Sequence, residues 1–451
     1  MAASVADAIV QDVVALGWPE GEVLGSEPEL LERYGVSRAV FREAVRLVEH
    51  KEVARMRRGP GGGLVVTVPT VESVMDAVAV YLFYVGANVD EVFEARLVLE
   101  EFVTELAPSR LGEAEVLALR EQLAKERAGE ADGYRELHAL LAQLTHNPAL
   151  EFFVDLMNRV STLFMSDPSL LERSTISASS HAHVAIAESV LSGDDGLARH
   201  RMRKHLRAEA EYLRSSARTE IELPRPDAGQ KRGQVVAFSI LQDIADAGWS
   251  VGTLVGSERE LMERYGVSRA VLREAVRVLE HHRAARMRRG PGGGLFVAQP
   301  GIAATTEAVA LHLHRLAITP AQLFEVRTAI EIAVVERGVQ RLGGDDVTAL
   351  REAVESERAA SSEQLRELAH GVHGVLATAS GNRVLELLAL VLLRLTRIHQ
   401  GPTPRNPIDP DAASGLAKVH ERIVEAVVDG DVELARLRMR KHLDALADYV
   451  S

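Results

Sequence analysis

Hydrophobic residues recur with helical spacing along most of the chain, and the same pattern occurs in both halves. Each half begins with a helical stretch that ends at a Gly-Trp pair, at 17–18 and at 248–249. A segment rich in arginine and glycine follows, and Pro69 or Pro300 separates it from a long run with few glycines or prolines. Apolar residues at spacings of three and four are typical of amphipathic helices. The pattern therefore predicts, in each half, a small domain followed by an all-helical bundle.

The two halves are copies related by a shift of 231 residues. The segment that starts at Gly25 reads GSEPELLERYGVSRAVFREAVRLVEHKEVARMRRGPGGGLVV, and the one that starts at Gly256 reads GSERELMERYGVSRAVLREAVRVLEHHRAARMRRGPGGGLFV. Similarity this high means that one module occurs twice, and weaker matches extend through both bundles. The expected domains are a small domain at 1–69 and its bundle at 70–214, a polar linker at 215–233, and a second small domain at 234–300 with its bundle at 301–451.

Two short helices are expected at the centre of each repeat. Ser26 and Glu29 form the S-x-x-E pattern of a capping box, which starts a helix, and Gly35 ends that helix. Ser37 then caps the next helix. The second copy repeats these residues at positions 257, 260, 266 and 268. Two helices joined by a tight Gly-Val-Ser turn are typical of a helix-turn-helix motif.

The second helix of this motif has an apolar face and a basic face. Val40, Ala44 and Leu47 are spaced i, i+4 and i+7, and this spacing predicts that they pack inward. Arginines recur every four residues on another face, where their planar guanidinium groups could bind guanine edges or phosphates. These arginines are Arg38, Arg42 and Arg46 in the first copy and Arg269, Arg273 and Arg277 in the second.

A basic segment, a glycine-rich turn and a β-branched run follow this helix and predict a β-hairpin wing. Glycines permit positive φ and close backbone approach, and the neighbouring arginines would lie beside a groove of DNA. A loop that cradles a nucleotide phosphate is the alternative, disfavoured because no helix opens after GPGGG and no Lys-Ser/Thr follows it. The candidate DNA contacts of the wings are Arg57, Arg58, Gly61, Arg288, Arg289 and Gly292.

Charge is distributed unevenly along the chain. The net charge is −13, yet Val36–Val68 carries seven Lys/Arg against three Glu, and Val267–Gln299 carries seven Arg against two Glu. Two basic islands on an acidic body are expected if only the islands meet phosphate. A solvated charged helix face is the alternative interpretation.

Composition narrows the class of protein further. The chain has 451 residues and no cysteine, which excludes disulfides and thiolate metal sites and fits a reducing compartment. The first residues lack the pattern of a signal peptide, and no apolar run approaches about 18 residues. We therefore expect a cytoplasmic protein without a membrane partner.

With these residues in view, the chain resembles the GntR family of winged-helix transcription regulators. The motif SE.EL.ERYGVSRAV.REAVR.LEH followed by a wing carries this resemblance, and FEAR...E or FEVR...E with the later histidines resembles the C-terminal domain of the FadR subfamily. The resemblance implies a mainly α fold with small β wings, formed by two winged helix-turn-helix domains and two all-α antiparallel helical bundles. It also implies contacts to operator DNA at Ser37, Arg38, Arg42, Arg259, Ser268, Arg269 and Arg273.

The first copy departs from the family at one of these positions. It has Pro28 where the second copy has Arg259. Because proline is tolerated in the first turn of a helix, the fold should survive while one DNA contact is lost. The two readers are therefore expected to be unequal and to prefer an operator with unequal halves.

The resemblance also implies a divalent metal in each bundle, held by three histidines and an aspartate one turn before the first. The aspartate is absent, since Tyr134 and Ala369 stand at its two positions. Three imidazoles suit Zn²⁺ or Ni²⁺ with one open position, and His370 or Glu209 could replace the aspartate. Hydrogen-bonded core histidines are the alternative. The candidate ligands are His138, His183 and His205 in the first bundle and His373, His420 and His442 in the second.

Two arginines in the bundles are candidates for binding an acidic effector. They are Arg96 and Arg327, which occupy the same place in the two copies. A salt bridge to Glu100 or Glu331, four residues further along the same helix, is the alternative role.

The sequence as a whole predicts a transcription regulator rather than an enzyme. We expect a ligand-responsive repressor that binds operator double-stranded DNA as a single-chain pseudo-dimer and responds to a small organic acid; a further homodimer of the chain is compatible with the sequence. One alternative is a metal-dependent hydrolase that uses the three-histidine sites, although no H-E-x-x-H and no Ser/His/Asp order supplies its base or nucleophile. Another is a regulator whose bundles only dimerise.

Overall fold

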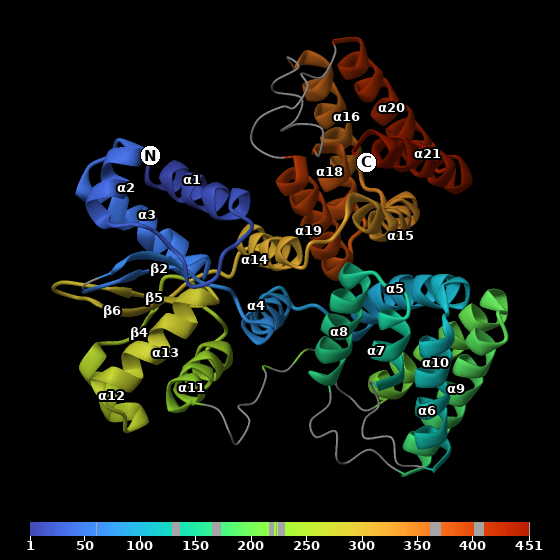
Figure 1. The fold of residues 1–451 in the computed structure, drawn as a ribbon, viewed down its shortest axis with the longest axis horizontal. Coiled ribbons are helices and arrows are strands. Elements are labelled where there is room, and N and C mark those ends of the chain that lie inside the picture. Colours follow the sequence, from blue (N-terminus) through green and yellow to red (C-terminus); the bar gives the residue numbers. More distant parts are fainter. Residues whose placement is uncertain are drawn as a thin grey trace. The chain divides into compact units, whose positions relative to one another are not determined.

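A computed structural model gives the structure of residues 1–59, 61–128, 136–164, 173–215, 221, 223, 231–360, 371–400 and 410–450. The chain forms two compact units (Figure 1). One unit contains Met1–Tyr84 and Leu223–Arg315, and the other contains residues 85–222 and Leu316–Ser451. Both small domains therefore belong to one unit, and both bundles belong to the other. In the described part of the chain, no helix has the length and apolar character needed to cross a membrane.

The two small domains share one architecture. In each, a first helix packs on the third, and the third packs on the wing. The wing is a three-stranded antiparallel sheet with the order β1-β3-β2 or β4-β6-β5. The first copy contains α1 Ala2–Ala15, β1 Val23–Gly25, α2 Glu27–Tyr34, α3 Arg38–His50, β2 Ala54–Arg57 and β3 Gly63–Val66. The second copy contains α11 Arg232–Asp246, β4 Leu254–Gly256, α12 Glu258–Tyr265, α13 Arg269–His281, β5 Ala285–Arg288 and β6 Gly294–Val297.

The expected caps and wings are confirmed in both copies. The Glu29 carboxylate accepts a hydrogen bond from the Ser26 backbone N–H at 2.7 Å, and Gly35 ends α2 with a φ of 61°. Ser37 accepts from the backbone N–H of Val40 at the start of α3. The glycine-rich segment forms the tip between β2 and β3 and does not open a helix, unlike a nucleotide-binding loop.

The buried face of α3 differs from the expected one. Ala44 is buried, but Val40 and Leu47 are only half-buried. The centre of the face is formed by Phe41, Val45 and Val48, which are also spaced by three and four. Both stripes satisfy helical periodicity because they are neighbours on one broad apolar surface.

Two connecting helices cross between the copies within this unit. They are α4 Val71–Tyr84 and α14 Ile302–Arg315, which pack against each other (Figure 1). Val80 of α4 lies in the core of the second small domain, the DNA reader of the second copy, and the ring centroid of Phe83 is 5.9 Å from that of Trp249. In the other direction, Glu307 of α14 pairs with Lys51 of the first reader at 3.4 Å. Each connecting helix thus contacts the reader of the other copy.

Part of the segment 215–233, which was expected to be a linker, packs against the rest of the protein. Leu223 is buried among the apolar residues of the second reader, and Ile221 is also buried. Most of the remaining linker lies outside the described residues.

The other unit consists of two helical bundles, each arranged around a long helix, α5 or α15. Their helices contact one another in the same pairs in both copies, for example α5 with α10 and α15 with α21. The first bundle contains α5 Val89–Arg110, α6 Glu113–Ala128, α7 Glu136–Gln143, α8 Pro148–Thr162, α9 Arg173–Leu191 and α10 Asp195–Ser215. The second contains α15 Pro320–Arg341, α16 Gly344–Ala359, α18 Gly371–Ala379, α19 Arg383–Gln400, α20 Pro410–Val428 and α21 Val432–Val450.

The two bundles meet through equivalent surfaces. The Asn147 side-chain amide donates to Glu325 at 2.9 Å, and the amide of Asn382 donates to Glu94 at 2.8 Å. Arg110 pairs with the same Glu325 at 2.6 Å, which ties the first bundle to α15. Because each copy supplies both a donor and an acceptor, the contact has the reciprocal form of a two-fold interface.

Candidate functional site

The recognition helices α3 and α13 present their arginines to solvent. The side chains of Arg38, Arg42, Arg269 and Arg273 are between 63% and 65% exposed. In the first copy both arginines approach Glu27, the first residue of α2, and in the second both approach Glu258. Exposed ion pairs contribute about 0–1 kcal/mol, so these guanidinium groups can exchange a glutamate for a phosphate or a base edge at little cost.

The remaining candidate DNA contacts are also at the surface. Ser37 and Ser268 cap the recognition helices, and Arg259 lies exposed in the first turn of α12. Its counterpart Pro28 occupies the first turn of α2, where the helix forms normally. The structure therefore accommodates the proline, and the first copy presents no guanidinium at this place.

The wings carry the other candidates. Arg57, Arg58, Arg288 and Arg289 are exposed, and Arg57 donates to the carbonyl of Gly61 at 2.8 Å. Gly61 and Gly292 have φ of 68° and 72°, and a Cβ at either place would meet open space. This left-handed backbone conformation favours glycine at both positions. The open space beside them leaves room for another molecule to approach the tips of the wings.

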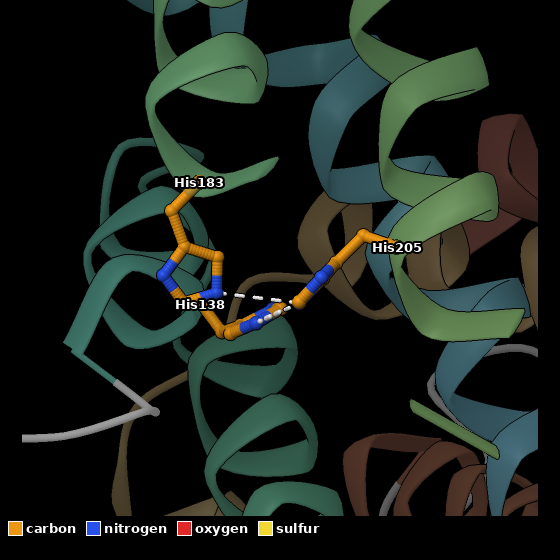
Figure 2. A group of neighbouring side chains, drawn as sticks. All are labelled: His138, His183 and His205. Carbon is orange, nitrogen blue, oxygen red and sulfur yellow. Dashed lines mark hydrogen bonds between the residues drawn. The ribbon is translucent and has the colours of Figure 1, made fainter. Parts of the chain in front are cut away.

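In the first bundle, three helices bring their candidate histidines together (Figure 2). His138 on α7, His183 on α9 and His205 on α10 are buried. The Nε2 atom of His205 lies 3.2 Å from that of His183 and 3.3 Å from that of His138. The three ring nitrogens therefore converge on one point from three separate segments of the chain.

The second bundle repeats this arrangement. His373 on α18, His420 on α20 and His442 on α21 are buried. The Nε2 atom of His442 lies 3.2 Å from that of His373 and 3.1 Å from that of His420. In both bundles the histidines that the resemblance implied are thus brought together.

In each bundle, buried carboxylates contact the Nδ1 atoms of two of the three histidine rings, on the side away from the Nε2 atoms. In the first bundle, Glu126 accepts from His183 Nδ1 at 2.9 Å, and Glu100 contacts His138 Nδ1. In the second, Glu357 accepts from His420 Nδ1 at 2.6 Å, and Glu331 contacts His373 Nδ1. A carboxylate at Nδ1 fixes the tautomer that leaves the Nε2 lone pair directed at the centre.

Sequence reasoning missed the orienting role of Glu126 and Glu357. A signal for them existed, because these two glutamates match at the same shift of 231 that relates the readers. They lie on α6 and α16, which supply none of the histidines, so the matching alone did not connect them with the site.

Electrostatics keep these groups in the states that bind a cation. Burial lowers the pKa of His183 to about 4 and that of His442 to about 2, so both imidazoles are neutral at pH 7. Burial alone would raise the pKa of Glu100, but the neighbouring Arg96 and His138 outweigh it and lower the pKa to about 2. Neutral imidazoles and ionised carboxylates are the forms that ligate metals.

The donor set fits a divalent transition metal. Zn–N bonds of about 2.0–2.1 Å in a tetrahedral arrangement place neighbouring nitrogens about 3.3 Å apart, close to the observed separations. Imidazole nitrogen suits Zn²⁺ and Ni²⁺. A bound ion would act as a Lewis acid toward an oxygen ligand. The positions of the missing aspartate, 134 and 369, and the candidate His370 lie outside the described residues.

Arg96 and Arg327 are fully buried beside these centres. The Nε atom of each lies 2.7 Å from the glutamate four residues later, Glu100 or Glu331. The salt bridge that the sequence offered as the alternative role is therefore present in both copies. Arg96 also pairs with Glu209 at 2.8 Å.

Comparison with known families and proteins gives a consistent result. The FCD domain family matches residues 91–208 and again 322–445, and the family described as bacterial regulatory proteins, gntR family, matches residues 232–297. Both regions with the three-histidine centres and the second reader are thus matched.

Individual relatives match about half of the chain. The Uxu operon regulator of Haemophilus influenzae is 24% identical over 208 residues, which cover 45% of this chain and 76% of the relative. The Exu regulon transcriptional regulator of Escherichia coli K12 is 25% identical, over 47% of this chain and 81% of the relative. Among solved structures, a GntR protein of Streptococcus agalactiae is 22% identical, covers 48% of this chain and 99% of its own, and has a TM-score of 0.37.

Proposed function

We propose that this chain, which belongs to the GntR family of bacterial regulatory proteins and carries two FCD domains, works as a single-chain pseudo-dimer. These domains make it a ligand-responsive DNA-binding regulator. Its two recognition helices would read two half-sites of one operator, as a repressor of the FadR subfamily. The observation that carries this proposal is the presence of two arginine-bearing recognition helices, α3 and α13, in one compact unit. Tethered readers bind their second half-site intramolecularly, which raises avidity without new contacts.

The contact between the bundles supports pairing within one chain. Beside the reciprocal asparagines, Arg383 makes two hydrogen bonds to the carboxylate of Glu91, at 2.8 and 2.6 Å. The residue that corresponds to Arg383 in the first bundle is Pro148. Two first halves would therefore leave the buried Glu91 without its cation, whereas a first and a second half satisfy it. This pair favours contact of a first half with a second half over contact of two first halves.

Reversing this ion pair should show its contribution. We expect Glu91→Arg to lower the free energy of unfolding of the bundle unit by about 2 kcal/mol, because it places two cations together at a partly buried site. Adding Arg383→Glu should restore most of the loss. Urea denaturation measures both effects, and the matched control is the same reversal of the exposed pair Asp90–Arg214, which should change little. A double variant no more stable than the single one would contradict the specificity of the contact.

Ligand control follows from the bundles. The three-histidine centres and the buried arginines form polar groups inside otherwise apolar helix cores, where a small organic acid and a divalent metal could bind. Such a ligand regulates DNA binding only if it prefers one arrangement of the protein, with a coupling of typically about 1–3 kcal/mol.

Selection of bound sequences from random duplexes tests the proposed function most directly. We expect one enriched site with two related but unequal half-sites, centred about one turn, or 10 base pairs, apart or a multiple of it. Recovery of a single half-site would contradict the pseudo-dimer but leave a DNA-binding regulator. No enrichment over scrambled competitor at physiological ionic strength would refute the function itself.

A further inference from the structure

The two histidine centres are not equivalent, because one position beside them differs between the copies. His205 and His442 match at a shift of 237, and the residue four positions later is Glu209 in the first bundle and Leu446 in the second. Residues four apart lie on the same face of a helix. The first centre therefore has a carboxylate at a place where the second has a hydrocarbon side chain.

In the first bundle the Glu209 carboxylate lies beside one histidine of the cluster. It is 6% exposed, and its Oε2 lies 2.8 Å from Arg96 Nη1. Its Oε1 lies 2.9 Å from His205 Nε2. The three imidazole nitrogens lie within 4.8 Å of one another, and the Glu209 oxygen lies outside this group, beside His205. Imidazole lone pairs this close repel one another unless a cation or a shared proton lies among them. The first centre thus has a fourth donor residue beside His205, at a place where the second centre has none.

In the second bundle the arginine lacks the corresponding partner. Arg327 repeats the other contacts of Arg96, through Nε to Glu331 and through Nη1 to the hydroxyl of Thr396 at 3.2 Å. Its Nη2 is buried and has no hydrogen-bond partner in the described part of the chain. A buried guanidinium N–H without an acceptor is unfavourable, and a bidentate carboxylate is the ligand whose geometry it matches best.

The two centres also differ in the formal charge of their side chains, and the second is the less negative. The first centre contains three carboxylates and one guanidinium, so a divalent cation makes the described cluster neutral. The carboxylates are those of Glu100, Glu126 and Glu209, and the guanidinium is that of Arg96. In the described part of the second centre there are two carboxylates, Glu331 and Glu357, and the guanidinium of Arg327, so a divalent cation leaves one positive charge. A single carboxylate would neutralise it.

We propose that Glu209 is a built-in carboxylate ligand that closes the first centre, and that the second centre is open and binds a carboxylate-bearing small molecule through Arg327. The chain then responds to one ligand molecule, and its halves divide two tasks, metal retention in the first bundle and sensing in the second. The sensing role of the second bundle rests on the proposed function. The difference between the two centres holds for any role of the protein.

Cobalt substitution with acetate as the probe tests this division. The full chain, stripped of metal and loaded with two equivalents of Co²⁺, would be titrated with acetate while the visible d–d absorption and the bound acetate are followed. We expect one acetate per chain and a spectral change in only one of the two Co²⁺ populations. Two equivalent acetates, or no response up to concentrations that saturate free Co²⁺, would overturn the proposal.

Exchanging the differing residue should convert each centre into the other type. Glu209→Leu should raise the acetate stoichiometry to two, and Leu446→Glu should lower it to zero. Glu209→Gln, which keeps the size of the side chain, should weaken metal binding at the first centre by at least about tenfold and guards against misfolding of the leucine variant. The control is Glu211→Leu on the exposed face of α10. Unchanged stoichiometry in both exchanged variants would refute the assignment of Glu209.

The same proteins separate this inference from the proposed function. Operator binding of each variant would be measured with the site recovered by selection. If the centres differ as described but no duplex is selected, the proposed function fails and the closed and open centres remain. If DNA is bound but both centres take acetate equally, the regulator stands and the division between the bundles fails.

Discussion

Replacing Arg273 with alanine should weaken specific operator binding by about 1–3 kcal/mol, the range expected for loss of one bidentate base contact. The guanidinium group is 65% exposed on α13, and its ion pair with Glu258 is weak enough that its loss does not offset a lost DNA contact. Fluorescence anisotropy with the selected operator measures the change. Arg120→Ala, on an exposed position of α6 in the bundle unit, is the control and should leave the affinity unchanged.

Arg42→Ala in the first reader should cost less than Arg273→Ala. The first reader already has Pro28 at the position of Arg259, so it contributes fewer contacts to the specific complex. Pro28→Arg should strengthen binding and shift the preferred operator toward equal halves. Equal losses in the two alanine variants, with no effect of Pro28→Arg, would contradict unequal readers.

Replacing His442 should remove the metal from the second bundle. Its Nε2 lies within 3.2 Å of both other ring nitrogens, so the remaining two histidines do not form a three-nitrogen site. We expect metal content to fall from two equivalents to one, and the bundle to lose the stabilisation that metal at about 100–1,000 times its Kd provides, about 3–4 kcal/mol. Elemental analysis measures the content, and melting with and without chelator measures the stability.

A variant of similar size controls for packing at this site. His442→Gln avoids the cavity of an alanine, and His200→Ala on the exposed face of α10 should keep both metals. If wild-type protein purified without chelator contained no metal, and chelator left its melting unchanged, the histidines would be hydrogen-bonded core residues instead.

Local features of the fold could be predicted where one short segment determines the geometry. The Ser26–Glu29 cap, the Gly35 helix end and the hairpin wing depend on neighbouring residues, and each is confirmed. The buried face of α3 was displaced by one position, because Val40 and Leu47 border the same apolar surface whose centre is Phe41. Periodicity finds such a face, but only the packing partner defines its middle.

The sites could be predicted only in part, for a related reason. Matched histidines in two copies indicated a cluster, and the chain does bring them together. The carboxylates that orient them come from helices with no other mark of function, such as Glu126 on α6. Likewise, Glu209 could be proposed as a neighbour of His205, but its pairing with Arg96 depends on two helices meeting.

The sequence by itself determined the duplication, the caps, the wings, the arginines of the recognition helices and the histidine sets, since each of these is recorded in residue type and spacing along one chain. Only the tertiary structure decided which carboxylate reaches which ring, and that α4 and α14 cross to the opposite small domains. It also decided that Arg327, among the described residues, has no counterpart of the Glu209 that pairs with Arg96. These relations join segments far apart in sequence, and they arise from packing and burial, which no local pattern encodes.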